Sequence, residues 1–229
     1  MAVSSTTIRI LTDSRGRGLE HRILSELDSS KNIRIIFNVY PGTTLEKLRH
    51  KLPRGQAALT LIIAGICNFT TSSKEGRKRI VTYNTALNVR QERKDSIKST
   101  ILDLLDNYGS CIVSTIAPAK LTILDNLDQK DDQQALLADL QEINTFIKEE
   151  SEKRNINILN LAKTFFLSSR KRRGKSRKTV WRFAEEALPD GVHLNPKLQD
   201  RWAKIIATCI TKFLQRDQEG EIEFESESE

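Results

Sequence analysis

Residues 8–18, which read IRILTDSRGRG, decide the fold. Their first half, Ile8–Thr12, is a short β-branched run, and their second half is rich in residues that favour turns. This pattern predicts a buried strand that ends in a tight turn. Leucine and isoleucine then recur at helical spacing over residues 15–27. A strand, a turn and a helix in this order are typical of one unit of a parallel α/β sheet.

The same alternation continues along the chain. Further strand-like runs are expected at residues 33–39, 58–65, 111–116 and 156–161, and helices at residues 44–52, 80–107, 131–153 and 197–214. Five apolar strands separated by helices predict a three-layer α/β/α domain, in which helices cover both faces of a five-stranded parallel sheet. Ligands of such sheets bind beyond the carboxyl ends of the strands, so we expect the chemistry in the segments that follow them.

Composition narrows the protein class. The chain has 229 residues, enough for one large domain, and no run approaches the roughly 20 apolar residues of a membrane helix. The first residues do not follow the pattern of a secretion signal. Three widely spaced cysteines indicate neither a disulfide framework nor a zinc site. We therefore expect an intracellular protein, cytoplasmic or nuclear, without a metal or other cofactor; the sequence leaves its oligomeric state open.

Charge is distributed unevenly. Seven of the 30 acidic residues lie in residues 217–229, which contain no Lys or Arg, so residues 1–216 hold 23 acidic and 37 basic residues. We expect residues 1–216 to form the domain and residues 217–229 to be a disordered acidic tail. The basic surface of residues 1–216 either binds a polyanion or is only well solvated, without a dedicated partner.

The basic residues are densest in residues 168–178, SSRKRRGKSRK. This stretch has no apolar side chain to bury, so we expect a mobile loop. It could serve nuclear import or contact nucleic-acid phosphates, or be a solvated loop without a partner. The residues expected to contact nucleic acid are Arg170, Lys171, Arg172, Arg173, Lys175, Arg177 and Lys178.

Among three histidines, one has the setting of a catalytic base. His21 and His50 lie within expected helices, where surface or packing roles are usual. His193 lies in the turn-rich stretch LPDGVHLNP, three residues after Asp190. An Asp at this spacing can fold back onto the imidazole, fix its tautomer and stabilise its protonated form.

Ser14 is the matching nucleophile, because it follows the first strand directly. A serine hydroxyl needs a base to remove its proton, and a strand-to-helix turn exposes the oxygen beside backbone N–H groups. The alternative is that Asp13 or Ser14 only caps the next helix.

Four motifs in order resemble sequence blocks of the SGNH (GDSL-type) hydrolases: Asp13-Ser14 with Gly18, Pro41-Gly42-Thr43-Thr44, Gly65 with Asn68, and Asp190 with His193. The resemblance spans most of the chain and implies a flavodoxin-like SGNH-hydrolase fold. It also implies a serine esterase that works through an acyl-serine intermediate. Because few aromatic residues are available to line a long lipid tunnel, we expect its substrates to be short, acetyl-type esters. Its catalytic residues would be Ser14, Asp190 and His193, and its oxyanion hole would be formed by Ser14, Gly42 and Asn68.

Two departures from the family pattern concern the site. Thr12 stands where the family has the glycine before Asp-Ser. Gly65 and Asn68 are separated by two residues instead of one, so either Asn68 still reaches the oxyanion or Cys67 takes its place and the donor is lost. We expect Asn68.

Arg15 adjoins Ser14, and we expect it to contact an anionic group of the substrate; a solvent-facing side chain is the alternative. Similar esterase domains occur in first-open-reading-frame proteins of LINE retrotransposons, and a retrotransposon-like context fits the basic stretch. The competing function is a catalytically weak SGNH-fold module that binds nucleic acid or a protein through its basic surface. A nucleotide-binding domain is disfavoured, since no Gly-rich phosphate loop occurs.

Overall fold

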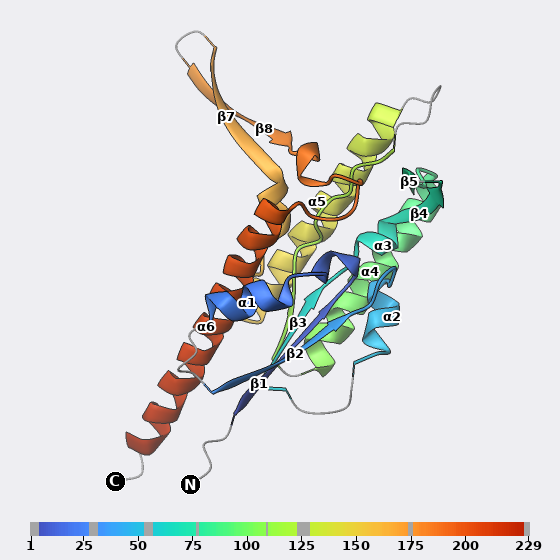
Figure 1. Ribbon diagram of the computed structural model, residues 1–229. Helices are drawn as coiled ribbons and strands as arrows, with labels where there is room; N and C mark the ends of the chain where they lie inside the picture. The colour runs from blue at the N-terminus through green and yellow to red at the C-terminus, as the bar shows by residue number, and fades with distance from the viewer. Residues whose placement is uncertain are drawn as a thin grey trace.

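The computed structural model describes residues 5–27, 32–52, 57–76, 78–108, 110–122, 129–173 and 176–226. At its centre is a parallel sheet with strand order β2-β1-β3-β6 (Figure 1). These strands are β1 (Thr6–Thr12), β2 (Ile33–Val39), β3 (Leu59–Ile63) and β6 (Cys111–Val113). The main helices are α1 (Glu20–Glu26), α2 (Leu45–Arg49), α4 (Leu87–Asn107), α5 (Gln129–Lys153) and α6 (Pro196–Ser226).

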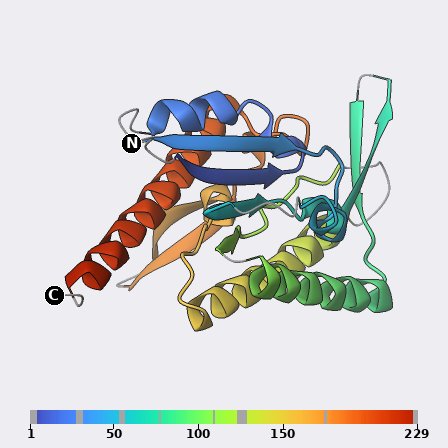
Figure 2. The same cartoon turned by 90° about the horizontal axis from the view of Figure 1, so that it is seen from below.

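Helices cover both faces of the sheet, as Figure 2 shows. Successive side chains of a strand point to opposite faces, so β1 contributes to two cores. Ile8 and Ile10 pack with α1 and α6 on one face, and Leu11 packs with α2, α4 and α5 on the other. All three side chains are fully buried. The predicted three-layer α/β/α architecture is therefore confirmed.

The predicted fifth strand is not formed. Residues 156–161 run beside the continuation of β6, where the Thr115 amide donates to the Leu159 carbonyl at 3.0 Å. The Leu161 amide, which would continue a parallel ladder, donates instead to the Leu159 carbonyl of its own segment at 3.1 Å, and the Ala162 amide donates to the Thr115 hydroxyl at 2.9 Å. The ladder ends there, and the sheet has four strands among the described residues.

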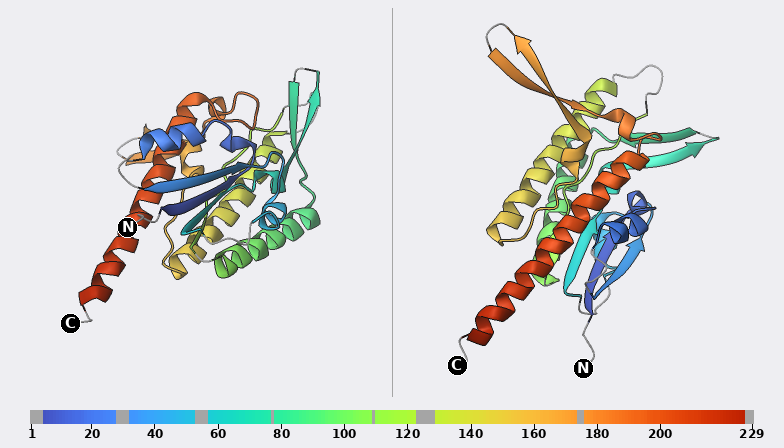
Figure 3. Two further views of the ribbon diagram at one scale, coloured as in Figure 1. Left: turned by 60° about the horizontal axis from the view of Figure 1, so that its bottom comes forward. Right: turned by 60° about the vertical axis from the view of Figure 1, so that its left-hand side comes forward.

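Two antiparallel hairpins project from the body (Figure 3). One pairs β4 (Thr70–Glu75) with β5 (Lys78–Tyr83). The prediction of helix from residue 80 is therefore wrong at its start, because Ile80 and Val81 are β-branched and continue β5.

The other hairpin pairs β7 (Phe166–Arg173) with β8 (Ser176–Phe183), and it corrects the prediction of a loop at 168–178. Phe166 and Phe183 pair across its base with ring centroids 6.2 Å apart. This aromatic contact stabilises the base of the hairpin, and the basic residues lie further along the same pair of strands. Lys175, one of the predicted nucleic-acid contacts, lies outside the described residues.

Helix α6 continues through Ser226, beyond the end of the sheet (Figure 1). The prediction that the chain is disordered from residue 217 is therefore wrong as far as residue 226. Extending an existing helix adds one hydrogen bond per ordered residue, and Glu and Gln are good helix formers. No helix in the described part of the chain is long and apolar enough to span a membrane.

The turn after β1 contains a size match between two residues. Thr12 is fully buried, and a Cβ atom on Gly16 would lie 1.9 Å from its Cγ2 atom. Glycine at position 16 thus provides the room that threonine at position 12 occupies. The turn accommodates threonine at position 12 in this way.

We predict that Gly16→Ala lowers the free energy of unfolding by about 1–3 kcal/mol, because the added methyl group overlaps Thr12. Thr12→Gly/Gly16→Ala should be more stable than Gly16→Ala alone. Urea unfolding of both variants, with Thr12→Gly as the control, measures the coupling. Equal stability of Gly16→Ala and the unchanged protein would contradict this packing.

Candidate active site

Asp190 and His193 form a compact turn before α6. The Nδ1 atom of His193 lies 2.6 Å from Oδ2 of Asp190, and Oδ1 accepts hydrogen bonds from the amides of Val192 at 3.1 Å and His193 at 2.7 Å. Partial burial would raise the pKa of Asp190, but the bonds from His193 and Val192 outweigh it and lower the pKa to about 2. Asp190 is therefore ionised at any pH where an imidazole titrates.

The other ring nitrogen of His193 is the atom that a general base would use. Nε2 is buried and has no hydrogen-bond partner among the described residues. With a proton on Nδ1 facing Asp190, Nε2 carries the lone pair that can accept a proton. His193 acts to lower the pKa of the carboxyl of Asp13, so its ring lies close to the turn that starts at Ser14, the predicted nucleophile, which we call the nucleophile turn.

Ser14 begins a 3₁₀ turn, η1 (Ser14–Gly16), at the carboxyl end of β1. The side chain of Asp13 caps this turn by accepting from the Arg15 amide at 2.9 Å. Asp13 is almost fully buried, and burial raises its pKa against the opposing effect of Arg15. The helix-capping alternative is thus realised by Asp13, while Ser14 is half-buried and its hydroxyl takes no part in the cap.

Arg15 ties the nucleophile turn to two distant segments. Its Nε atom donates to the Val192 carbonyl at 3.0 Å, Nη1 to Ala117 at 2.6 Å and Nη2 to Pro118 at 2.6 Å. The guanidinium carbon lies 6.0 Å from the centre of the Phe165 ring. Arg15, which follows Ser14, is therefore bonded to Val192, which precedes His193.

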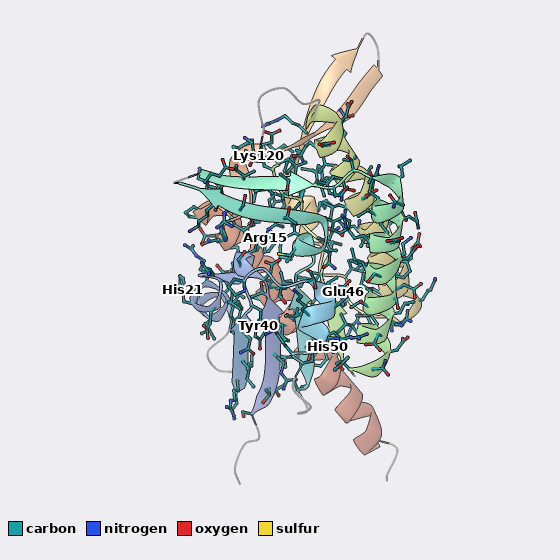
Figure 4. All side chains as sticks on the ribbon, turned by 90° about the vertical axis from the view of Figure 1, so that its right-hand side faces the viewer. Arg15, His21, Tyr40, Glu46, His50 and Lys120 are labelled. Atoms are coloured by element: carbon teal, nitrogen blue, oxygen red, sulfur yellow. The ribbon has the colours of Figure 1, made fainter. Side chains whose placement is uncertain are left out.

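The expectation that Arg15 contacts the substrate does not fit this placement. Only 4% of Arg15 is exposed, and each of its three nitrogens donates to a backbone carbonyl. In Figure 4, Arg15 lies between the sheet and the β4–β5 hairpin, whereas His21 and His50 lie away from it. Those two histidines are exposed, on α1 and at the end of α2.

The loop that follows β2 lies beside the nucleophile turn. The Tyr40 amide donates to the Thr12 carbonyl at 2.7 Å, and Gly42 has a φ of +69°, a conformation that suits glycine. Thr44 then caps α2 with its hydroxyl. These contacts hold the backbone around Gly42 near Ser14.

Asn68 is placed differently from the expectation. It lies in the short helix α3 (Ile66–Phe69), and its Oδ1 atom accepts from the Leu45 amide at 2.9 Å. Its Nδ2 atom donates to Oε2 of Glu46 at 2.7 Å. The side chain thus fastens α3 to the start of α2, and the amide group expected at an oxyanion is bound to a carboxylate.

Cys67, the alternative occupant of the third position, lies near the nucleophile turn, since Asp13 and Arg15 both act on its thiol. Burial, together with Asp13, raises the pKa of this thiol to about 11. Cys67 is a neutral thiol at physiological pH and a weak hydrogen-bond donor. Of the two arrangements that the spacing allows, this placement resembles the one in which Cys67 takes the place of the asparagine.

The sequence did not point to Arg79, which contacts the site from β5. Its Nε atom lies 3.3 Å from Oδ2 of Asp190, the oxygen that also faces His193. A basic residue in a charged stretch gives no sign of such a distant partner. No group of His, Cys, Asp and Glu side chains suited to a metal occurs in the described part of the chain.

Comparison with family models and with curated proteins finds no match. Solved structures do match over most of their length. A GDSL-like lipase from Bacteroides thetaiotaomicron is 14% identical with a TM-score of 0.54, and the match covers 93% of this chain and 89% of that one. A lipase/acylhydrolase from Enterococcus faecalis is 14% identical with a TM-score of 0.55, covering 88% and 93%. A carbohydrate acetylesterase from Sinorhizobium meliloti is 12% identical with a TM-score of 0.53, covering 91% and 99%.

At identities this low, the structural similarity establishes the fold alone, and the chemistry has to be inferred from the residues of the site. The predicted SGNH-hydrolase fold is confirmed. The ends of β1, β2 and β3 bring three of the motif segments to one edge of the sheet, and the bond from Arg15 to Val192 holds the fourth, Asp190–His193, beside the Ser14 turn. The chain has the fold of the GDSL-type lipases and acylhydrolases.

Proposed function

We propose that the protein is a serine esterase in which Ser14 is the nucleophile and His193, oriented by Asp190, is the base. One observation carries the proposal: Nδ1 of His193 is held on Asp190 at 2.6 Å while the buried Nε2 has no partner among the described residues. The Arg15 bond to Val192 keeps that ring close to the Ser14 turn. A base held this way accepts a serine proton and returns it to the leaving group.

The reaction runs in two halves. His193 takes the proton of Ser14 as its oxygen attacks the ester carbonyl, and the alcohol leaves with that proton. Water then attacks the acyl-serine and gives a proton to His193, the acid is released, and His193 returns that proton to the oxygen of Ser14. Asp190 stays ionised throughout and stabilises the imidazolium, since its pKa is lowered to about 2.

The oxyanion hole is assigned chiefly to the backbone amides of Ser14 and Gly42. Asn68 would donate there only after its amide leaves Glu46. One donor of this kind is worth on the order of a hundredfold in turnover or more, so the arrangement fits a modest esterase. A short acyl group, such as acetyl, is the proposed substrate part; the acetylesterase from Sinorhizobium meliloti shares the fold.

Ser14→Ala and His193→Asn should each lower the hydrolysis of p-nitrophenyl acetate by roughly a thousandfold or more, because each removes a reacting group. Labelling by a fluorophosphonate probe should disappear in Ser14→Ala. His21→Asn, which changes an exposed histidine outside the site, is the control. Turnover or labelling that survives Ser14→Ala would exclude the proposal.

A second candidate function is the binding of nucleic-acid phosphates by the β7–β8 hairpin. In its register, Lys171 pairs with Lys178 and Arg172 pairs with Arg177. These paired positions carry basic residues on both strands of the hairpin, and dense positive charge attracts polyanions. The pairing therefore favours a partner that carries many phosphates.

Replacing these four residues with Gln should weaken binding of a labelled RNA oligonucleotide and reduce the slope of log affinity against log salt by about 3. A control variant replaces four exposed basic residues elsewhere with Gln: Lys47, Lys197, Arg201 and Lys204. It should keep most of the affinity. Equal losses in both variants would mean that only total charge matters and would remove the hairpin as a site.

A further inference from the structure

The β4–β5 hairpin brings a permanent positive charge to the carboxylate behind the base. The Nε atom of Arg79 lies 3.3 Å from Oδ2 of Asp190, and Nη1 donates to the Ser72 hydroxyl across the hairpin at 3.3 Å. Oδ2 is also the oxygen that faces Nδ1 of His193 at 2.6 Å. One carboxylate oxygen is thus shared between the imidazole and a guanidinium.

Backbone contacts fix the hairpin in this place. The Thr122 hydroxyl accepts a hydrogen bond from the Val81 amide at 2.8 Å and donates one to the Arg79 carbonyl at 3.2 Å. The Thr122 amide donates to the Val81 carbonyl at 2.9 Å. At the end of β5, the Tyr83 hydroxyl bonds Asp139 of α5. Hydrogen bonds other than the ion pair with Asp190 therefore hold the strand that carries Arg79.

The same segment also holds the Asp190 turn. The Lys120 amide donates to the Gly191 carbonyl at 2.9 Å. A Cβ atom on Gly191 would lie 2.7 Å from the Lys120 carbonyl oxygen and 3.2 Å from Val81 Cγ2. The turn is therefore packed against Lys120 and the β4–β5 hairpin with no space for a side chain at position 191.

We propose that Arg79 is a positioning residue that, through Asp190, sets the pH at which His193 gains its proton. The proposal rests on the proposed role of His193 as the base. Asp190 and Asp13 favour the imidazolium, whereas Arg79 opposes it. Arg15, whose charge also acts on Asp190 and Asp13, opposes it from the other side of the turn.

The charge balance has a functional consequence. Only the neutral imidazole can take the serine proton, and two carboxylates beside it would keep it protonated to higher pH. Arg79 offsets part of that effect without displacing the hydrogen bond to Nδ1. The β4–β5 hairpin thereby extends the active range of the base toward lower pH.

The test compares three variants of the full chain. Arg79→Gln removes the charge, Arg79→Lys keeps it, and Lys74→Gln removes an exposed charge at the position paired with Arg79 in the same hairpin. The readout is the NMR titration of the imidazole C–H resonances. The chain has three histidines, and His193→Asn assigns the relevant resonance.

In Arg79→Gln, the His193 midpoint should rise by roughly half to one pH unit, since the pair is partly exposed and screened. The midpoint pH of the acid limb in the rate profile of p-nitrophenyl acetate hydrolysis should rise by the same amount. Arg79→Lys and Lys74→Gln should stay close to the unchanged protein. Arg79→Met, which keeps the aliphatic stem, replaces the Gln variant if that variant does not fold.

An unchanged midpoint in the neutral Arg79 variants, or an equal shift in Lys74→Gln, would overturn the inference. Lower turnover at every pH with an unmoved midpoint would also overturn it, because Arg79 would then act only on structure. The NMR readout needs no activity. A shifted midpoint in a protein without Ser14-dependent turnover would support the coupling and reject the esterase.

Discussion

The site depends on a buried guanidinium. Arg15 brings a charge that is costly to remove from water, and hydrogen bonds to Val192, Ala117 and Pro118 offset that cost. These carbonyls belong to segments that start more than a hundred residues further along the chain. Because Arg15 follows Ser14 and Val192 precedes His193, one side chain holds the Ser14 turn and the His193 turn together. The substrate must then be recognised by other groups.

The segments around the Arg15 hydrogen bonds follow the carboxyl ends of three different strands. The first strand supplies Ser14, the second supplies the Gly42 loop through the bond from Tyr40 to Thr12, and the third supplies α3. The Asp190 turn closes over them and is held in turn by Lys120 and the β4–β5 hairpin. A parallel sheet provides this convergence because all its carboxyl ends lie at one edge. The β4–β5 hairpin adds the charge of Arg79 to that edge.

Contacts could be predicted from the sequence where the two interacting residues are close along the chain. Asp190 and His193 are three residues apart, so their contact could be predicted from turn chemistry alone, and the β-branched run 8–12 predicted the central strand. Arg15, Asn68 and Arg79 could not be placed, because their partners lie 177, 23 and 111 positions away. The hairpins were missed for a related reason. Polar strands that pair only with each other lack the apolar pattern by which strands are recognised.

In the proposed mechanism, Ser14 forms the covalent bond with the substrate while His193 Nε2 acts as its base. The most direct test is a crystal structure of the protein after reaction with a small phosphonate ester that mimics the tetrahedral intermediate. We expect phosphorus bonded to Ser14 Oγ, its free oxygen within hydrogen-bond distance of the Ser14 and Gly42 amides, and Nε2 of His193 facing the adduct. An unmodified Ser14, or an adduct on another residue such as Cys67, would contradict the account.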